Sequence, residues 1–291
     1  MELRHVRGLT GISINPYRII GAAPGDHLGL PSSTVTLIVD LDGGLSLSEP
    51  DRSGRRTFRC CLGGMHLRPV IIHHTGTQIG VAASLSPAAV RALFGLPAAE
   101  LWTTNIELGD VAPGLARRLY DATGTVPHEE RGPVAARIID EATSVARARA
   151  IDPDAERAWR LIQHAGGQIT VARLVELSGW SARYLTRVFT AEYGVGPKQA
   201  ARLARFDHAR AELETGGAIA DVAADCGYAD QAHLTREFAR ITGHPPKEFL
   251  AVRASEFSGA AAYGIDVDEL CPRDVRSRPI LTTTRRWRRH G

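Results

Sequence analysis

The sequence predicts an α+β protein: a β-rich, barrel- or sandwich-like N-terminal domain that also carries helices, followed by an all-α domain. Three observations support this division. Short β-branched and apolar runs broken by glycine dominate up to about residue 100. Apolar residues at helical spacing dominate from there to about residue 250. A segment within the helical half also recurs 49 residues further along the chain.

The N-terminal elements can be placed from local patterns. Residues 33–47 and 67–85 predict strands that break at Gly43-Gly44 and at Thr75-Gly76. Ser86 followed by Pro87 predicts a helix start. Further helices are expected over 112–123 and 132–150. Asp154 is expected to cap the next helix, which puts the domain boundary near 151–154.

The composition is that of an ordinary globular chain. Its 291 residues suffice for about two domains, with 44% hydrophobic and 23% charged residues. It has no apolar run of about 18 residues and no signal-peptide pattern, so we expect a cytoplasmic protein without a membrane span. The net charge of +3 selects no class of partner, and residues 151–250 carry 12 basic and 13 acidic side chains.

Motifs for catalysis or metal binding are not found. The cysteines form no CxxC pair, which disfavours structural zinc. His66, His73 and His74 are candidate metal ligands, but His73 and His74 are adjacent in a predicted strand and must face opposite sides of it. No nucleophile elbow, phosphate loop or zinc motif occurs. We expect no catalytic residue, metal or cofactor, with an enzymatic N-terminal domain as the contrary hypothesis.

The repeat lies in the helical half. Residues 185–197 match residues 234–246, with Leu, Thr, Arg, Phe, Gly and Pro in register. Before each copy an apolar helical pattern ends at a glycine, Gly179 or Gly227, as expected of a left-handed helix end. Ser181 and Asp230 are then placed to cap the second helices. Each copy is therefore predicted to be a helix-turn-helix.

The repeat also predicts which side of each second helix is exposed. Leucine and phenylalanine at i and i+4 form a buried stripe in both copies. The opposite side carries arginine, glutamine and threonine, and the forked groups of arginine and glutamine match the edges of guanine and adenine. A helix over 198–214 joins the copies and spans roughly 25 Å, compared with about 34 Å for one turn of B-DNA.

The pattern "IADVAADCGYADQAHLTREFARITGHPPKEFL", with its upstream partner, resembles the AraC/XylS family of bacterial transcriptional regulators over about residues 155–250. The resemblance implies sequence-specific DNA binding through both second helices. It places base-facing residues at Arg183, Thr186, Arg187, Gln231, His233, Thr235 and Arg236. Phosphate contacts are expected from Ser181, Lys198, Arg202 and Arg240, with Arg205 as a further candidate. Two departures are Val175, where the family usually has alanine, and Ala232, where a polar residue often faces a base.

The N-terminal half resembles the variable domain of actinobacterial AraC-like regulators, over stretches such as "GLPSSTVTLIVDLD" and "IELGDV". This resemblance implies an effector-sensing or dimerisation domain over 1–152, and the AraC/XylS resemblance implies a DNA-binding domain over 153–250. Beyond it, residues 251–291 lose clear periodicity and end in an arginine-rich stretch, so we expect a basic, partly disordered tail. The expected partners are double-stranded promoter DNA, RNA polymerase, an unidentified small-molecule effector and a second copy of the chain. The alternatives are a constitutive regulator whose N-terminal domain only dimerises, and a helical protein-interaction module that binds no DNA.

Overall fold

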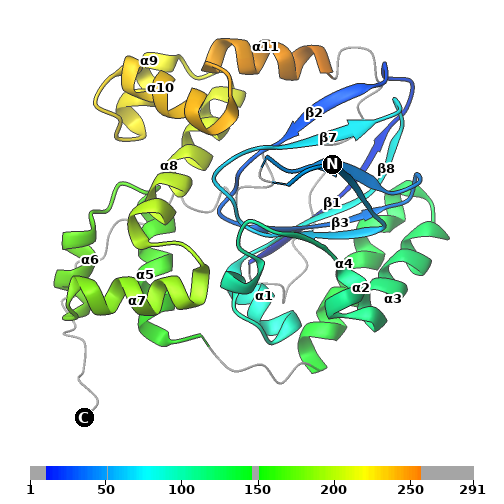
Figure 1. Cartoon of the computed structure of the whole chain (residues 1–291), viewed down its shortest axis with the longest axis horizontal. Helices are drawn as coiled ribbons and strands as arrows, with labels where there is room; N and C mark the ends of the chain where they lie inside the picture. Colours follow the sequence, from blue (N-terminus) through cyan, green and yellow to red (C-terminus); the bar gives the residue numbers. More distant parts are fainter. Residues whose placement is uncertain (1–10, 51, 146–150, 257–291) are drawn as a thin grey trace.

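The computed structural model describes residues 11–50, 52–145 and 151–256 (Figure 1). Its N-terminal half contains two antiparallel sheets. The first has the order β1 (Ile12–Ile19), β8 (Gln78–Leu85), β3 (Val35–Asp40), β6 (Cys60–Gly63) and β9 (Asn105–Glu107). The second has the order β2 (Gly25–Gly29), β7 (Val70–His74), β4 (Leu45–Ser48) and β5 (Arg55–Phe58). The predicted fold class is confirmed.

Helices cover one face of the first sheet. Val35, Leu37 and Val39 alternate along β3 and point to this covered face, as the period of two in a strand requires. The covering elements are α1 (Pro87–Phe94), the 3₁₀ helix η1 (Ala98–Leu101), α2 (Leu108–Val111), α3 (Pro113–Gly124) and α4 (His128–Val145). A smaller apolar cluster around Leu47 and Phe58 packs the second sheet. As predicted, the Ser86 hydroxyl caps α1, accepting from the amide of Ala89 at 3.2 Å.

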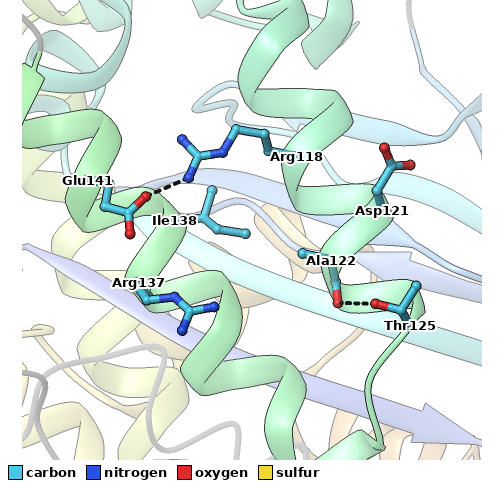
Figure 2. Close-up of a pocket in the computed structure, with 7 residues that line it drawn as sticks. All are labelled: Arg118, Asp121, Ala122, Thr125, Arg137, Ile138 and Glu141. Atoms are coloured by element: carbon cyan, nitrogen blue, oxygen red, sulfur yellow. Dashed lines mark hydrogen bonds and ion pairs between the residues drawn. The ribbon is translucent and has the colours of Figure 1, made fainter.

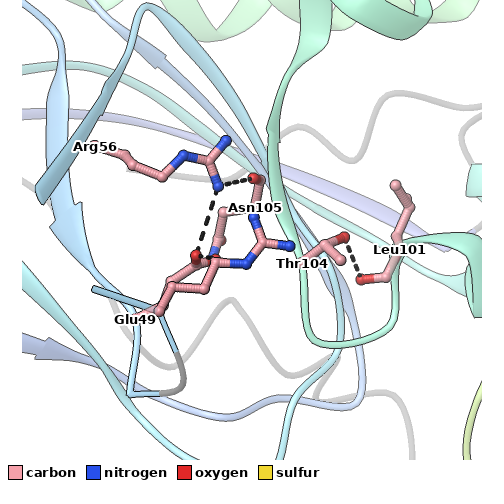
Figure 3. Close-up of polar contacts among 6 residues, drawn as sticks. Glu49, Arg56, Leu101, Thr104 and Asn105 are labelled. Atoms are coloured by element: carbon pink, nitrogen blue, oxygen red, sulfur yellow. Dashed lines mark hydrogen bonds and ion pairs between the residues drawn. The ribbon is translucent and has the colours of Figure 1, made fainter. Parts of the chain in front are cut away.

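A polar cluster ties the two sheets together at one edge (Figure 3). The Asn105 side chain on β9 donates to Glu49 Oε1 at 2.6 Å, and Arg56 on β5 donates to the Asn105 carbonyl at 3.0 Å. The Glu49 side chain is 7% exposed and lies 3.5 Å from the Arg56 guanidinium. Asn105 thus bonds to both Glu49 and Arg56, so the cluster holds β9 of the first sheet against β5 of the second.

The second half is helical, with α5 (Pro153–His164), α6 (Val171–Ser178), α7 (Ala182–Tyr193), α8 (Pro197–Glu214), α9 (Ile219–Asp225), α10 (Gln231–Thr242) and α11 (Pro246–Glu256). The prediction that Asp154 caps α5 is wrong. Pro153 occupies the first helical position, so the cap falls on Asp152, whose carboxylate accepts from the amides of Asp154 and Ala155. The predicted tail over 251–291 begins inside α11 and from residue 257 lies outside the described residues.

The hydrophobic cores do not follow the predicted domain boundary. One core runs from β3 and β8 through α4 into α5, α6, α7 and the first half of α8. A second core holds the other half of α8 with α9, α10 and α11. Figure 1 shows α8 running between these two groups of helices. The division between the two hydrophobic cores therefore falls within α8. The domain boundary at 152/153 stays a prediction.

Polar contacts also fix the N-terminal half against the helices. Arg91 on α1 forms a two-pronged ion pair with Glu192 at the end of α7, and both side chains are largely buried. The backbone amide of Ser33 donates to Asp207 on α8 at 2.9 Å. Burial raises the pKa of Asp207, while the nearby Arg210 and the Ser33 amide act in the opposite direction.

Within the described ranges, no helix is long and apolar enough to cross a membrane. The cysteines that are described, Cys60, Cys61 and Cys226, are free and buried. Burial raises the pKa of Cys60 and of Cys61 to about 12, so both remain protonated thiols at neutral pH.

Candidate nucleic-acid interface

The two predicted helix-turn-helix motifs are α6–α7 and α9–α10, and α8 joins them. The predicted caps of the second helices are confirmed. Ser181 Oγ accepts from the amide of Tyr184 at 3.2 Å, and Asp230 Oδ1 accepts from the amide of His233 at 2.6 Å. Gly179 ends α6 with φ of 68°, a left-handed conformation that favours glycine. The second turn differs by one residue from the prediction: α9 is capped by Cys226, and Gly227, with φ of 69°, follows it.

The buried and exposed sides of α7 and α10 are those expected from the repeat. Leu185 and Phe189 on α7 and Leu234 and Phe238 on α10 are fully buried. Their burial fixes the rotation of each helix, because residues four apart share a face. The opposite sides of α7 and α10 remain open to a partner.

The residues predicted to face bases lie on these open sides. Arg183, Thr186 and Arg187 of α7 are exposed, as are Gln231 and Arg236 of α10. His233 and Thr235 are half-buried, and each has a local hydrogen bond: His233 Nδ1 accepts from the amide of Ala229, and the Thr235 hydroxyl donates to the carbonyl of Gln231. In this arrangement His233 Nδ1 carries no proton. The base contacts themselves remain a prediction.

The predicted phosphate contacts have different surroundings. Lys198 is exposed at the start of α8, and the Ser181 hydroxyl is used as a cap. Arg202 on α8 pairs with Glu237 on α10 at 2.6 Å, and Arg240 forms a second ion pair with the same carboxylate. Glu237 thus partly neutralises the charge of both arginines. To contact phosphate, each arginine must either leave Glu237 or bind the phosphate and Glu237 together.

Sequence reasoning did not select Tyr184 as a site residue. Tyr184 is 40% exposed on α7, and its ring lies edge-on to Trp180 in the preceding turn with centroids 4.5 Å apart. The Arg187 guanidinium lies over the same ring, 5.0 Å from its centroid. Alignment of the two copies could have identified Tyr184, because it occupies the position that His233 has in the second copy. His233 likewise lies edge-on to Tyr228.

The N-terminal half offers a separate open groove of about 620 Å³ between α3 and α4. Figure 2 shows Arg118 of α3 reaching toward Glu141 of α4, and the two form an ion pair at 2.5 Å. Arg137, Asp121 and Ile138 also line the groove. Among the described residues, no group of three or more histidine, cysteine or acidic side chains could hold a metal ion. His73 bonds to Asp26 and Ser48, whereas the ring of His74 lies against His27.

Comparison with known proteins shows which kind of domain the helical region contains. Residues 174–251 match the model of a helix-turn-helix domain. This part of the chain is a helix-turn-helix domain. It is 35% identical over 74 residues to the uncharacterised HTH-type transcriptional regulator YbfI of Bacillus subtilis, covering 25% of this chain and 27% of that protein. It is 31% identical over 87 residues to an uncharacterised HTH-type transcriptional regulator of Staphylococcus aureus, covering 30% of this chain and 12% of that protein.

A solved structure resembles most of the chain. The crystal structure of an apo form of ToxT from Vibrio cholerae has a TM-score of 0.51 and 13% identity, covering 84% of this chain and 98% of that one. At this identity the likeness concerns the fold alone. The arrangement of N-terminal sheets and helices followed by a helix-turn-helix domain is thus shared with a known protein.

Proposed function

We propose that the protein is a sequence-specific DNA-binding transcriptional regulator of the AraC/XylS type, which contacts two adjacent major grooves through α7 and α10. The observation that carries this proposal is the duplicated surface. Two capped helices, each pinned by a buried leucine and phenylalanine, expose arginine and polar side chains on their opposite sides. Helices presented in this way suit the major groove, where arginine and glutamine distinguish base edges.

Selection of bound genomic fragments followed by footprinting tests the proposal. The protected site should span two successive major grooves. Arg187→Ala and Arg236→Ala should each weaken specific binding by about 1–3 kcal/mol and relax sequence preference at different positions. Arg117→Ala, which removes an exposed arginine of α3, serves as the matched control. Unaltered specificity in both helix variants would overturn the assignment of these arginines to base contacts.

We further propose that the N-terminal half, of the type found in actinobacterial AraC-like regulators, makes DNA binding responsive to a small-molecule effector. The continuous core from the first sheet into α7 supports this link, because it gives a ligand-dependent change in N-terminal packing a direct route to the first motif. A thermal-shift screen against metabolites tests the idea, since a bound ligand raises the unfolding midpoint by mass action. If dimerisation accompanies DNA binding while every ligand fails to stabilise the protein, the constitutive dimerising regulator is favoured instead.

In this role the protein works in the cytoplasm beside the chromosome, with promoter DNA and RNA polymerase as its macromolecular partners. Sedimentation with and without promoter DNA distinguishes a homodimer from a monomer that uses both motifs on one site. Transcription in vitro with purified polymerase then reports activation or repression.

A further inference from the structure

Three segments of the helical half contact one another between the two motifs. They are the turn over 165–168 between α5 and α6, the middle of α8, and the turn over 226–228 between α9 and α10. We call the contacts of Gly167, Gln168, Arg205, Gly227 and Tyr228 the inter-motif junction. It joins the first motif to the second by a route other than the continuous chain of α8.

The first part of the junction seats the 165–168 turn on α8. Gly167 has φ of 73°, and a Cβ at this position would lie 2.0 Å from the Ala201 carbonyl oxygen, so only glycine fits without a shift. Arg205 on α8 donates through Nη2 to the Gly167 carbonyl at 3.0 Å. Its guanidinium also lies 5.6 Å from the centroid of the Tyr228 ring. Arg205, on the helix that joins the motifs, therefore contacts both the turn that leads into the first motif and the turn of the second motif.

The second part of the junction is a contact between the turn that precedes α6 of the first motif and the end of α9 in the second motif. Gln168 Nε2 donates to the carbonyl of Asp225, at the end of α9, at 2.8 Å. The same side chain lies against the turn glycine of the second motif. A Cβ on Gly227 would come within 2.7 Å of Gln168 Oε1 and 3.0 Å of its Cγ. The glutamine thus holds the second turn by a hydrogen bond and by close packing.

These contacts constrain a motion that α8 alone leaves free. A single helix fixes the distance between the motifs at its ends, but each motif can still pivot about its junction with that helix. Contacts at Gln168 and Arg205 lie off the α8 axis and oppose such pivoting. On DNA the consequence is geometric, because one added base pair moves a half-site by about 3.4 Å and rotates it by roughly 34° about the duplex axis.

We propose that Gln168 and Arg205 are positioning residues that fix the relative orientation of α7 and α10, and thereby determine which spacing between two DNA half-sites the protein accepts. This inference rests on the proposed function. In this role Gln168 acts through the Asp225 carbonyl, and Arg205, which the sequence also offers as a phosphate contact, acts through Gly167 and Tyr228. They act through the second motif, so they control tolerance to spacing and leave base preference within each half-site unchanged.

The test uses the full chain and duplexes that carry the two selected half-sites at the best spacing, or with one base pair removed or one or two added. Wild-type protein should bind the altered duplexes at least about tenfold more weakly, comparable to a mismatched base pair. Gln168→Ala should reduce this penalty to about threefold or less, while its affinity for the best duplex stays within about threefold of wild type. Gln168 is exposed, so its substitution leaves both cores intact.

Two further variants sharpen the result. Gln168→Glu keeps the size of the side chain but sets a carboxylate against the Asp225 carbonyl, so it should relax spacing as much as alanine does. Gln199→Ala removes an exposed amide from α8 and should leave the spacing profile unchanged. A wild-type spacing profile in both Gln168 variants, with normal binding by the parent protein, overturns this inference alone. A parent protein that binds no duplex overturns the proposed function and the spacing inference with it.

Discussion

The two helix-turn-helix motifs share a sequence pattern but belong to different parts of the molecule. In both, a capped second helix is held down by leucine and phenylalanine and ends at a left-handed glycine, Gly194 or Gly243. The first motif packs into the core that contains the N-terminal sheets, whereas the second has a core of its own with α8 and α11. Contacts between the second core and the N-terminal half include Leu30.

The residues that differ between the copies account for the different attachments. Position 192 is glutamate in the first copy, where it pairs with Arg91, and its counterpart 241 is a buried isoleucine in the second. Gly194 lies against Trp102 so closely that a Cβ would come within 2.6 Å of the tryptophan Cβ. The residues shared by the two copies therefore determine the helix-turn-helix itself, and the residues that differ determine which part of the protein each motif packs against. In the proposed mechanism, a change in the N-terminal half reaches DNA first through α7, because α7 shares the core of the N-terminal sheets.

Truncating the matched phenylalanines should give the largest loss of stability and should show that the two cores respond separately. Phe189→Ala and Phe238→Ala should each cost about 3–5 kcal/mol, because both side chains are fully buried. Phe189→Ala should destabilise the N-terminal sheets together with α7, and Phe238→Ala should affect mainly α8–α11. Urea unfolding combined with site-resolved hydrogen exchange distinguishes the two patterns. Equal loss of protection throughout the chain in both variants would contradict the separation into two cores.

Removing the ion pair that attaches the first motif to the N-terminal half should give the next largest loss of stability. Glu192→Ala leaves Arg91 buried without its partner and should lower the free energy of unfolding by on the order of 3 kcal/mol. The double variant Arg91→Met with Glu192→Leu replaces the pair by apolar groups and should recover much of that loss. Denaturant titration of the three proteins checks this. A double variant less stable than Glu192→Ala would show that the pair is not the main attachment.

Substituting the turn glycine of each motif should give a smaller loss of stability that can be compared between the two motifs. Both Gly179 and Gly227 have left-handed φ values, so alanine at either should cost about 1–2 kcal/mol. A Cβ at Gly179 meets nothing within 4 Å, whereas at Gly227 it displaces Gln168. Gly227→Ala should therefore cost about 1 kcal/mol more, through loss of the Gln168 hydrogen bond. Thermal unfolding should show that the excess disappears when Gln168 is already alanine.

The smallest expected effect concerns the aromatic ring beneath Arg187. Tyr184→Ala removes that ring and should weaken specific DNA binding by about 0.5–1 kcal/mol, while Tyr184→Phe should bind nearly as wild type. Fluorescence anisotropy on the selected duplex measures both. Equal weakening by phenylalanine and alanine would point to the tyrosine hydroxyl in place of its ring.

Local rules predicted the helical half well and the N-terminal half in part. Ser181 and Asp230 cap helices as expected because capping depends on a few neighbouring residues. Strand β1 is hard to predict because it contains Pro16, which is tolerated there since β1 is an edge strand. Short strands such as β9 have too few residues to show a period and are defined by pairing with β6.

The sequence by itself determined the two motifs, their caps and the exposed sides of α7 and α10, because these follow from helical periodicity and from residues close together in the chain. Only the tertiary structure decided what each motif is attached to. Arg91 and Glu192 are 101 residues apart, and Gln168 and the Asp225 carbonyl are 57 apart. No local pattern encodes such partners, since a buried ion pair or a turn-to-turn hydrogen bond depends on how whole elements pack.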